Sequence, residues 1–142
     1  MFNTTPEQIW AVAMLAVSGF ALWRGGWVER AAALANILAW SASAVMQNRH
    51  NWVDPQWGVL GVDVAFLAFL LWLVVRTDRI WILPAAAFQL LAVVTHAAML
   101  ADDGVRAWAY ITALILWSYM VLITLAVGTY SYWRRPSVRR AR

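Results

Sequence analysis

The chain has 142 residues, of which 63% are hydrophobic, 14% aromatic and only 13% charged. A soluble domain of this size carries about 25% charged residues, so an ordinary soluble domain is excluded. A disordered chain is excluded too, because it combines low hydrophobicity with high charge. The absence of cysteine excludes a disulfide framework and a thiolate metal site. The composition therefore predicts a polytopic membrane protein.

Five apolar segments predict a single domain, a compact all-α bundle of five transmembrane helices with short loops. The first helix has a well-marked start, because Thr5 can cap it and Pro6 suits the first helical position. At 1.5 Å per residue, this helix is about 27 Å long and just crosses a bilayer core. The predicted helices cover residues 6–23, 28–46, 55–75, 79–101 and 104–132, and a basic tail follows at 133–142.

Turn residues mark the later boundaries. Asp54 is predicted to cap the third helix, with Pro55 at its first position, and Asp78 to cap the fourth. With that start, Pro84 would lie a turn and a half inside the fourth helix and cause a mild bend.

The distribution of arginine predicts the orientation. Nine Arg fall on the side of the first and third connections and the tail, and only Arg49 and Arg106 fall on the other side. This positive-inside bias predicts an external N-terminus and a cytoplasmic C-terminus. A count of four spans is the alternative, with the first or second segment at the membrane interface. The tail arginines are predicted to fix the topology and lie against anionic lipid: Arg134, Arg135, Arg139, Arg140 and Arg142.

Tryptophans fall at the predicted helix ends, where amphipathic rings anchor a helix at headgroup level. The predicted outer anchors are Trp10, Trp57 and Trp108, and the predicted inner anchors are Trp23, Trp81 and Trp133. Two such belts account for the high Trp content without a ligand.

Asp63 and His96 are predicted to form an intramembrane pair. The turn at 76–79 is short, so the third and fourth helices should be antiparallel neighbours, with the two side chains at similar depths. A lone Asp in hydrocarbon costs about 2.5 to 3.5 kcal/mol, so a partner is expected. The alternatives are that Asp63 bonds the backbone, Tyr110 or a partner subunit. The predicted supporting polar residues are Asn36, Gln89 and Tyr119, which can equally act as simple packing contacts.

No nucleotide-binding, hydrolase or metalloprotease motif occurs, so we expect no enzyme, cofactor or metal. A metal at His50 and Asp54, or a haem between His50 and His96, has too few well-placed ligands.

The expected function is a non-catalytic structural or accessory subunit of a membrane complex or homo-oligomer, multi-pass in a bacterial inner membrane. Its expected partners are the lipid bilayer and other membrane subunits, and not nucleic acid. The alternatives are a proton-conducting, ion-conducting or solute-transporting oligomer that uses Asp63 and His96, and, more weakly, a phage holin-like protein.

Overall fold

The computed structural model describes residues 5–47, 56–101 and 107–134, and every regular element within them is an α-helix. This confirms the predicted all-helical fold. The five helices are α1 (Thr5–Arg24), α2 (Trp27–Met46), α3 (Trp57–Arg76), α4 (Ile82–Ala101) and α5 (Ala107–Trp133).

Three of these helices are long and apolar enough to cross a membrane: α3, α4 and α5 from Trp108 to Trp133. The apolar part of α1 with described side chains is shorter, Gln8–Arg24. α2 carries Glu29 in its first turn, with Arg30 next to it. The count of five spans and the orientation of the termini therefore stay predictions.

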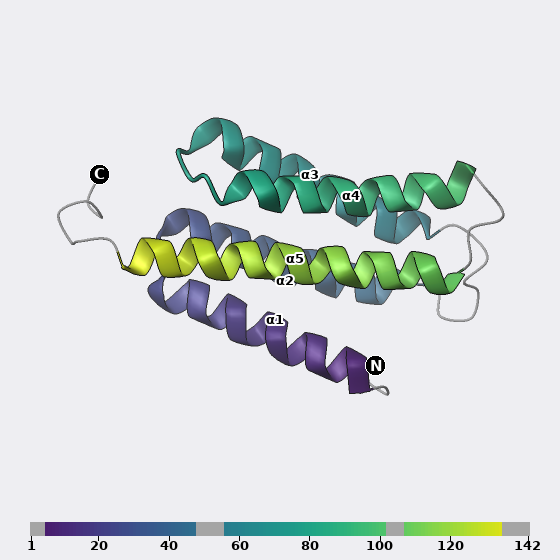
Figure 1. The fold of residues 1–142 in the computed structure, drawn as a ribbon, viewed down its shortest axis with the longest axis horizontal. Helices are drawn as coiled ribbons and strands as arrows, with labels where there is room; N and C mark the ends of the chain where they lie inside the picture. The colour runs from purple at the N-terminus through teal and green to yellow at the C-terminus, as the bar shows by residue number, and fades with distance from the viewer. Residues whose placement is uncertain (1–4, 48–55, 102–106, 135–142) are drawn as a thin grey trace.

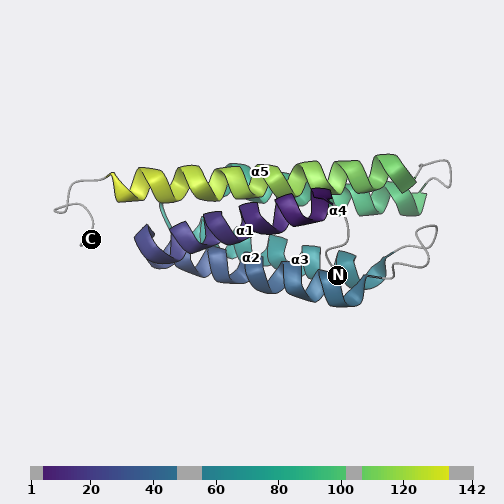
Figure 2. The ribbon, with the colours of Figure 1, turned by 90° about the horizontal axis from the view of Figure 1, so that it is seen from below.

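The helices form a closed ring (Figures 1 and 2). Each helix packs antiparallel against the next one in the chain, and α1 closes the ring by packing parallel to α5. Short connections between successive helices favour this neighbour-to-neighbour order.

Small side chains fill much of the space where the helices meet. Five of the twelve buried residues of the core cluster are alanines, and small residues let helix backbones approach closely. The cluster consists of Ala21, Val28, Ala32, Ala33, Phe66, Leu70, Leu73, Ile82, Ala85, Ala86, Val121 and Leu125. It draws on every helix and lies mainly in the half of the bundle where α2 and α4 begin.

The outside of the ring is apolar as well. Each helix presents large hydrophobic side chains that are about half exposed or more, for example Val12, Leu38, Leu71, Leu90 and Ile123. A soluble monomer rarely exposes so much contiguous apolar surface.

The fourth helix begins three residues later than predicted, at Ile82. The Ile82 amide donates to the Arg79 carbonyl at 3.1 Å, and the Leu83 amide donates to the Ile80 carbonyl at 3.2 Å, so a tight turn precedes the helix. Asp78 is therefore too far away to cap it. Pro84 lies in the first helical turn, where a missing N–H costs no hydrogen bond, so the predicted cause of a bend is absent.

The other predicted helix boundaries agree with the structure to within two residues where the structure describes them. The predicted start of the third helix at residue 55 and of the fifth at 104 lie outside the described residues, as does most of the tail.

Candidate functional site

The structure brings Asp63 of α3 and His96 of α4 into direct contact. The Oδ2 atom of Asp63 lies 3.0 Å from the Nε2 atom of His96. The His96 side chain is only 3% exposed and the Asp63 side chain is 19% exposed, so the contact is largely shielded. The predicted side-chain directions account for this meeting, because α3 and α4 run antiparallel and each side chain leans toward its own helix N-terminus.

Gln89, two helical turns before His96 on α4, holds the carboxylate from nearer the middle of the bundle. Its Nε2 atom donates to Asp63 Oδ1 at 2.9 Å and to the Asp63 backbone carbonyl at 3.2 Å. Gln89 and His96 are seven residues apart and both are buried on the same face of α4. Both oxygens of the Asp63 carboxylate therefore have a partner on α4.

Tyr110 extends the contacts to α5. Its hydroxyl lies 2.8 Å from His96 Nδ1, and the two rings meet edge to face with centroids 5.4 Å apart. From the sequence, Tyr110 was an alternative partner of Asp63. In the structure its hydroxyl instead contacts His96 Nδ1, the ring nitrogen that does not face Asp63. We call the four residues Asp63, Gln89, His96 and Tyr110 the Asp63 network.

When His96 is neutral, one tautomer satisfies the whole network. An ionised Asp63 only accepts hydrogen bonds, so the neutral His96 ring carries its proton on Nε2. The Nδ1 atom is then an acceptor, and the Tyr110 hydroxyl donates to it. If His96 becomes an imidazolium, Nδ1 donates instead and the Tyr110 oxygen accepts. The network can therefore hold either charge state of His96 without losing a contact.

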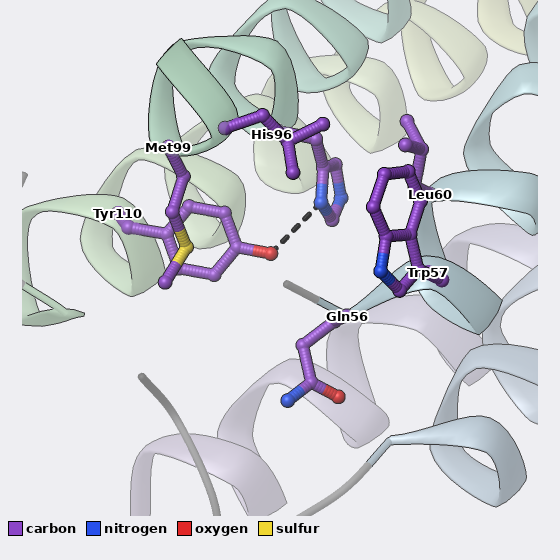
Figure 3. Close-up of a pocket in the computed structure, with 7 residues that line it drawn as sticks. Gln56, Trp57, Leu60, His96, Met99 and Tyr110 are labelled. Carbon is purple, nitrogen blue, oxygen red and sulfur yellow. Dashed lines mark hydrogen bonds between the residues drawn. The ribbon is translucent and has the colours of Figure 1, made fainter. Parts of the chain in front are cut away.

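A small pocket of about 10 Å³, room for about one water molecule, opens beside the network at the end of the bundle that holds Trp57 and Tyr110. Figure 3 shows the Tyr110 hydroxyl pointing at the His96 ring, with Gln56 across the open space. The pocket is far smaller than the roughly 300 to 1,000 Å³ of typical small-molecule sites. It is lined by Gln56, Trp57, Leu60, His96, Met99, Leu100 and Tyr110.

The other predicted supporting residues do not join the network. Asn36 is 9% exposed on α2, and its Nδ2 atom has no partner among the described residues. Tyr119 is partly buried on α5, away from the carboxylate.

Most of the predicted Trp anchors with described side chains are exposed at helix ends. Trp23, Trp57 and Trp108 are between 65% and 77% exposed, and Trp133 is 37% exposed. Trp10 instead stacks on Trp40, with ring centroids 5.0 Å apart.

Trp81 also faces inward, because it belongs to a second polar cluster that the sequence did not reveal. Glu29 is completely buried near the start of α2, at the end of the bundle opposite the Asp63 network. Its Oε2 atom accepts the Gly26 amide at 3.0 Å, and its Oε1 atom accepts the Trp81 indole N–H at 3.1 Å. The Nε atom of Arg79 lies 3.6 Å from Oε1, and the Arg79 guanidinium sits 4.7 Å from the centre of the Tyr132 ring. We call Gly26, Glu29, Arg79, Trp81 and Tyr132 the Glu29 cluster.

Two glycines make this second cluster possible. A Cβ on Gly26 would come within 2.8 Å of the Tyr132 ring, and a Cβ on Gly128 would overlap the Trp81 indole. Both residues have ordinary backbone angles, since no glycine of the described chain has a positive φ. They are therefore required for close approach and not for an unusual turn.

The tail is described only at its start. Arg134 donates to the Tyr130 hydroxyl at 3.1 Å, and the other predicted tail residues, Arg135, Arg139, Arg140 and Arg142, lie outside the described part. Within the described residues, no three His, Asp or Glu side chains converge as metal ligands. His50 and Asp54 lie outside that range.

Comparison with known proteins gives no match. No protein-family model matches the chain, no curated protein is detectably similar to its sequence, and no solved structure matches its fold. Its function must therefore be argued from the contacts above.

Proposed function

We propose that this chain is an integral membrane protein of five spanning helices that serves as a non-catalytic structural or accessory subunit. It would belong to a homo-oligomer or a larger complex in a bacterial inner membrane, with its N-terminus outside and its C-terminus in the cytoplasm. The observation that carries this proposal is that the Asp63 network directs its hydrogen bonds to neighbouring helices of the same chain.

The membrane part of the proposal rests on three kinds of residue. The apolar surface covers all five helices, and three of them meet the length and hydropathy needed to span a bilayer. Exposed tryptophans stand at both ends of the ring. The end with Arg24, Arg76 and Arg79 is rich in arginine, as cytoplasmic ends are.

The proposed role as a subunit rests on the hydrogen bonds that the buried polar side chains make. An ionisable side chain inside apolar helices is a functional candidate by default, since it is costly to bury. Here Asp63 receives donors from Gln89 and His96, and His96 in turn contacts Tyr110. These bonds fix α3 to α4 and α4 to α5. A bundle fixed in this way presents a defined apolar face to a second membrane protein.

In-membrane photo-crosslinking tests the subunit role. A photoreactive residue is placed at one exposed position on each helix, namely Val12, Leu38, Leu71, Leu90 and Ile123, with the buried Leu70 as the matched control. We expect protein cross-links at positions on one helix or two adjacent helices, and lipid adducts at the others. Lipid adducts at all five positions, together with a 16.0 kDa monomer after mild-detergent extraction, would contradict the proposal.

Reporter fusions test the five-span topology. A fusion after Trp133 should read cytoplasmic, and an insertion between residues 102 and 103 should read external. If both read the same side, α5 does not cross the membrane and the five-span count is wrong.

A further inference from the structure

We propose that the Asp63 network is a one-sided proton-binding site. It takes up and releases one proton at the end of the bundle where the pocket opens, and it does not pass that proton through the chain. The inference rests on the membrane placement in the proposed function and adds a form of regulation to it.

The first step is proton uptake from the pocket. In the starting state Asp63 is ionised, His96 carries a proton on Nε2, and the Tyr110 hydroxyl donates to Nδ1. A hydronium ion in the pocket gives a proton to the Tyr110 oxygen as the original hydroxyl proton moves to Nδ1. One water is left in the pocket, Tyr110 is again a neutral phenol, and His96 is an imidazolium. The 2.8 Å contact between the Tyr110 oxygen and Nδ1 suits this transfer.

The second step determines where the added proton lies within the pair of His96 and Asp63. The imidazolium lies 3.0 Å from the Asp63 carboxylate, so the two form an ion pair. Alternatively, the Nε2 proton passes to Oδ2, which leaves a neutral carboxylic acid and a neutral imidazole protonated on Nδ1. Both arrangements contain the same single added proton, and the pair shares it.

Gln89 ends the path on the inner side. A side-chain amide nitrogen has two hydrogens, and the Gln89 Nε2 atom makes two contacts, with Asp63 Oδ1 and with the Asp63 carbonyl. The amide nitrogen engaged in this way donates both hydrogens to Asp63 and cannot accept the proton of its carboxyl group. Further inward lie Phe66, Leu70 and Ala86 of the apolar core, which carry no side-chain group that could accept it.

Among the described residues, the titratable groups at this site are the Asp63 carboxyl group, the His96 imidazole and the Tyr110 phenol. Asp63 comes from α3, His96 from α4 and Tyr110 from α5, and Tyr119 lies more than two turns further along α5. α2 packs against α3, but its Glu29 and Arg30 are near the opposite end of the bundle, as is Arg76 of α3. Proton uptake therefore changes the charge of this network from negative to neutral with no nearby described charge to offset it.

Nitrogen NMR of the full chain in lipid nanodiscs tests the uptake. The chain has two histidines, and His50→Gln removes the one outside the network, so the remaining ring signal reports His96. We expect a ring protonated on Nε2 alone at about pH 8 and a change in ring protonation on acidification to about pH 5. A ring spectrum that stays the same across this range would overturn the proposal.

Tyr110→Phe, made in the His50→Gln background, tests the route. It keeps the ring packing but removes the hydroxyl that relays the proton. After a pH jump, proton uptake by His96 should slow by about tenfold or more, with the same final ring state. Tyr119→Phe is the matched control and should not change the rate. An unchanged rate in Tyr110→Phe would show that protons reach the partly exposed Asp63 directly, which contradicts the proposed route.

Proton flux into vesicles tests one-sidedness. Vesicles that contain the purified chain should carry no more proton current than protein-free vesicles of the same lipid. A current that is present in the wild-type chain and lost in Asp63→Asn would overturn the one-sided site and identify a conductor. These readouts use the purified chain alone, so their failure is distinct from a failure to find a partner subunit.

Discussion

The Asp63 network and the Glu29 cluster are two solutions to the same problem, a carboxylate held within an apolar bundle. Glu29 lies beside a helix end, where it accepts the Gly26 amide and pairs with Arg79. Asp63 lies within its helix, about 9 Å from Trp57 at helical rise, and its partners are an imidazole and an amide. Arginine stays charged under all ordinary conditions, whereas histidine does not.

This difference separates fixed contacts from changeable ones. The Glu29 cluster joins α2, the turn before α4, and α5 through contacts to an arginine, which stays charged. The Asp63 network keeps its contacts in two charge states. We therefore expect stability to depend mostly on the first region and proton response on the second.

Removing the fully buried carboxylate should have the largest effect. Glu29→Ala leaves the Trp81 N–H and Arg79 without their acceptor and removes the bond to the Gly26 amide. Breaking a buried ion pair costs 3–5 kcal/mol, and Arg79 is 17% exposed, so we expect a loss of about 3 kcal/mol in the free energy of unfolding. Steric trapping in bicelles measures it.

Glu29→Gln is the matched control, because the amide oxygen can still accept one of the hydrogen bonds. Its loss should be about 1 kcal/mol smaller than that of Glu29→Ala, because both variants remove the charge but only the amide keeps a hydrogen bond. Equal losses in the two variants would show that only the charge matters and that the hydrogen bonds to Gly26 and Trp81 contribute little.

An added methyl group at Gly128 should have the next largest effect. Its Cβ would overlap the Trp81 indole, so Gly128→Ala must displace Trp81 from Glu29. Overpacking of this kind costs about 1–3 kcal/mol, and tryptophan fluorescence should report the movement. Gly61→Ala is the control, because no atom beyond its own helical turn and chain neighbours lies within 4 Å of its added Cβ. It should be neutral or slightly stabilising, and a loss as large as that at Gly128 would count against the packing argument.

The smallest expected effect is the coupling within the Asp63 network. A double-mutant cycle of Asp63→Asn and His96→Ala should show a coupling energy of about 1 kcal/mol, in the upper part of the range for polar contacts between membrane helices. The uncharged pair of Thr95 and Trp117, joined by a 3.1 Å hydrogen bond, is the control and should couple by about 0.5 kcal/mol. Additive losses for Asp63 and His96 would mean that their contact contributes nothing to stability.

The sequence was most informative where a local pattern decides the structure. Runs of apolar residues place the helices, because a long hydrophobic stretch has few other ways to satisfy its backbone. The start of α4 was misplaced because Asp78 has the composition of a cap, whereas the turn there is bent by i to i−3 hydrogen bonds. Residue type alone does not distinguish a helix cap from a tight turn, because Asp is common in both.

The polar groups of the bundle likewise include one contact that the sequence predicts and one cluster that it does not. Asp63 and His96 were expected to meet, because the short turn between their helices fixes both partner and register. Glu29 was missed because its partner Trp81 is 52 residues away, and an acidic residue in a first helical turn is usually an ordinary capping residue. The available signal was the Gly25-Gly26 pair before it, which permits the close approach of Tyr132.

The closure of the ring by α1 and α5 imposes an order on biosynthesis. α1 leaves the ribosome first, and α5 leaves last. At ordinary elongation rates of 5–20 residues per second, about 5 to 20 seconds pass between the two. During that interval Phe20 and Arg24 lack their contact with Trp133, whose ring lies 6.4 Å and 5.3 Å away in the finished protein. One flank of the α1–α2 hairpin must therefore remain covered by lipid or by the insertion machinery until synthesis is nearly complete.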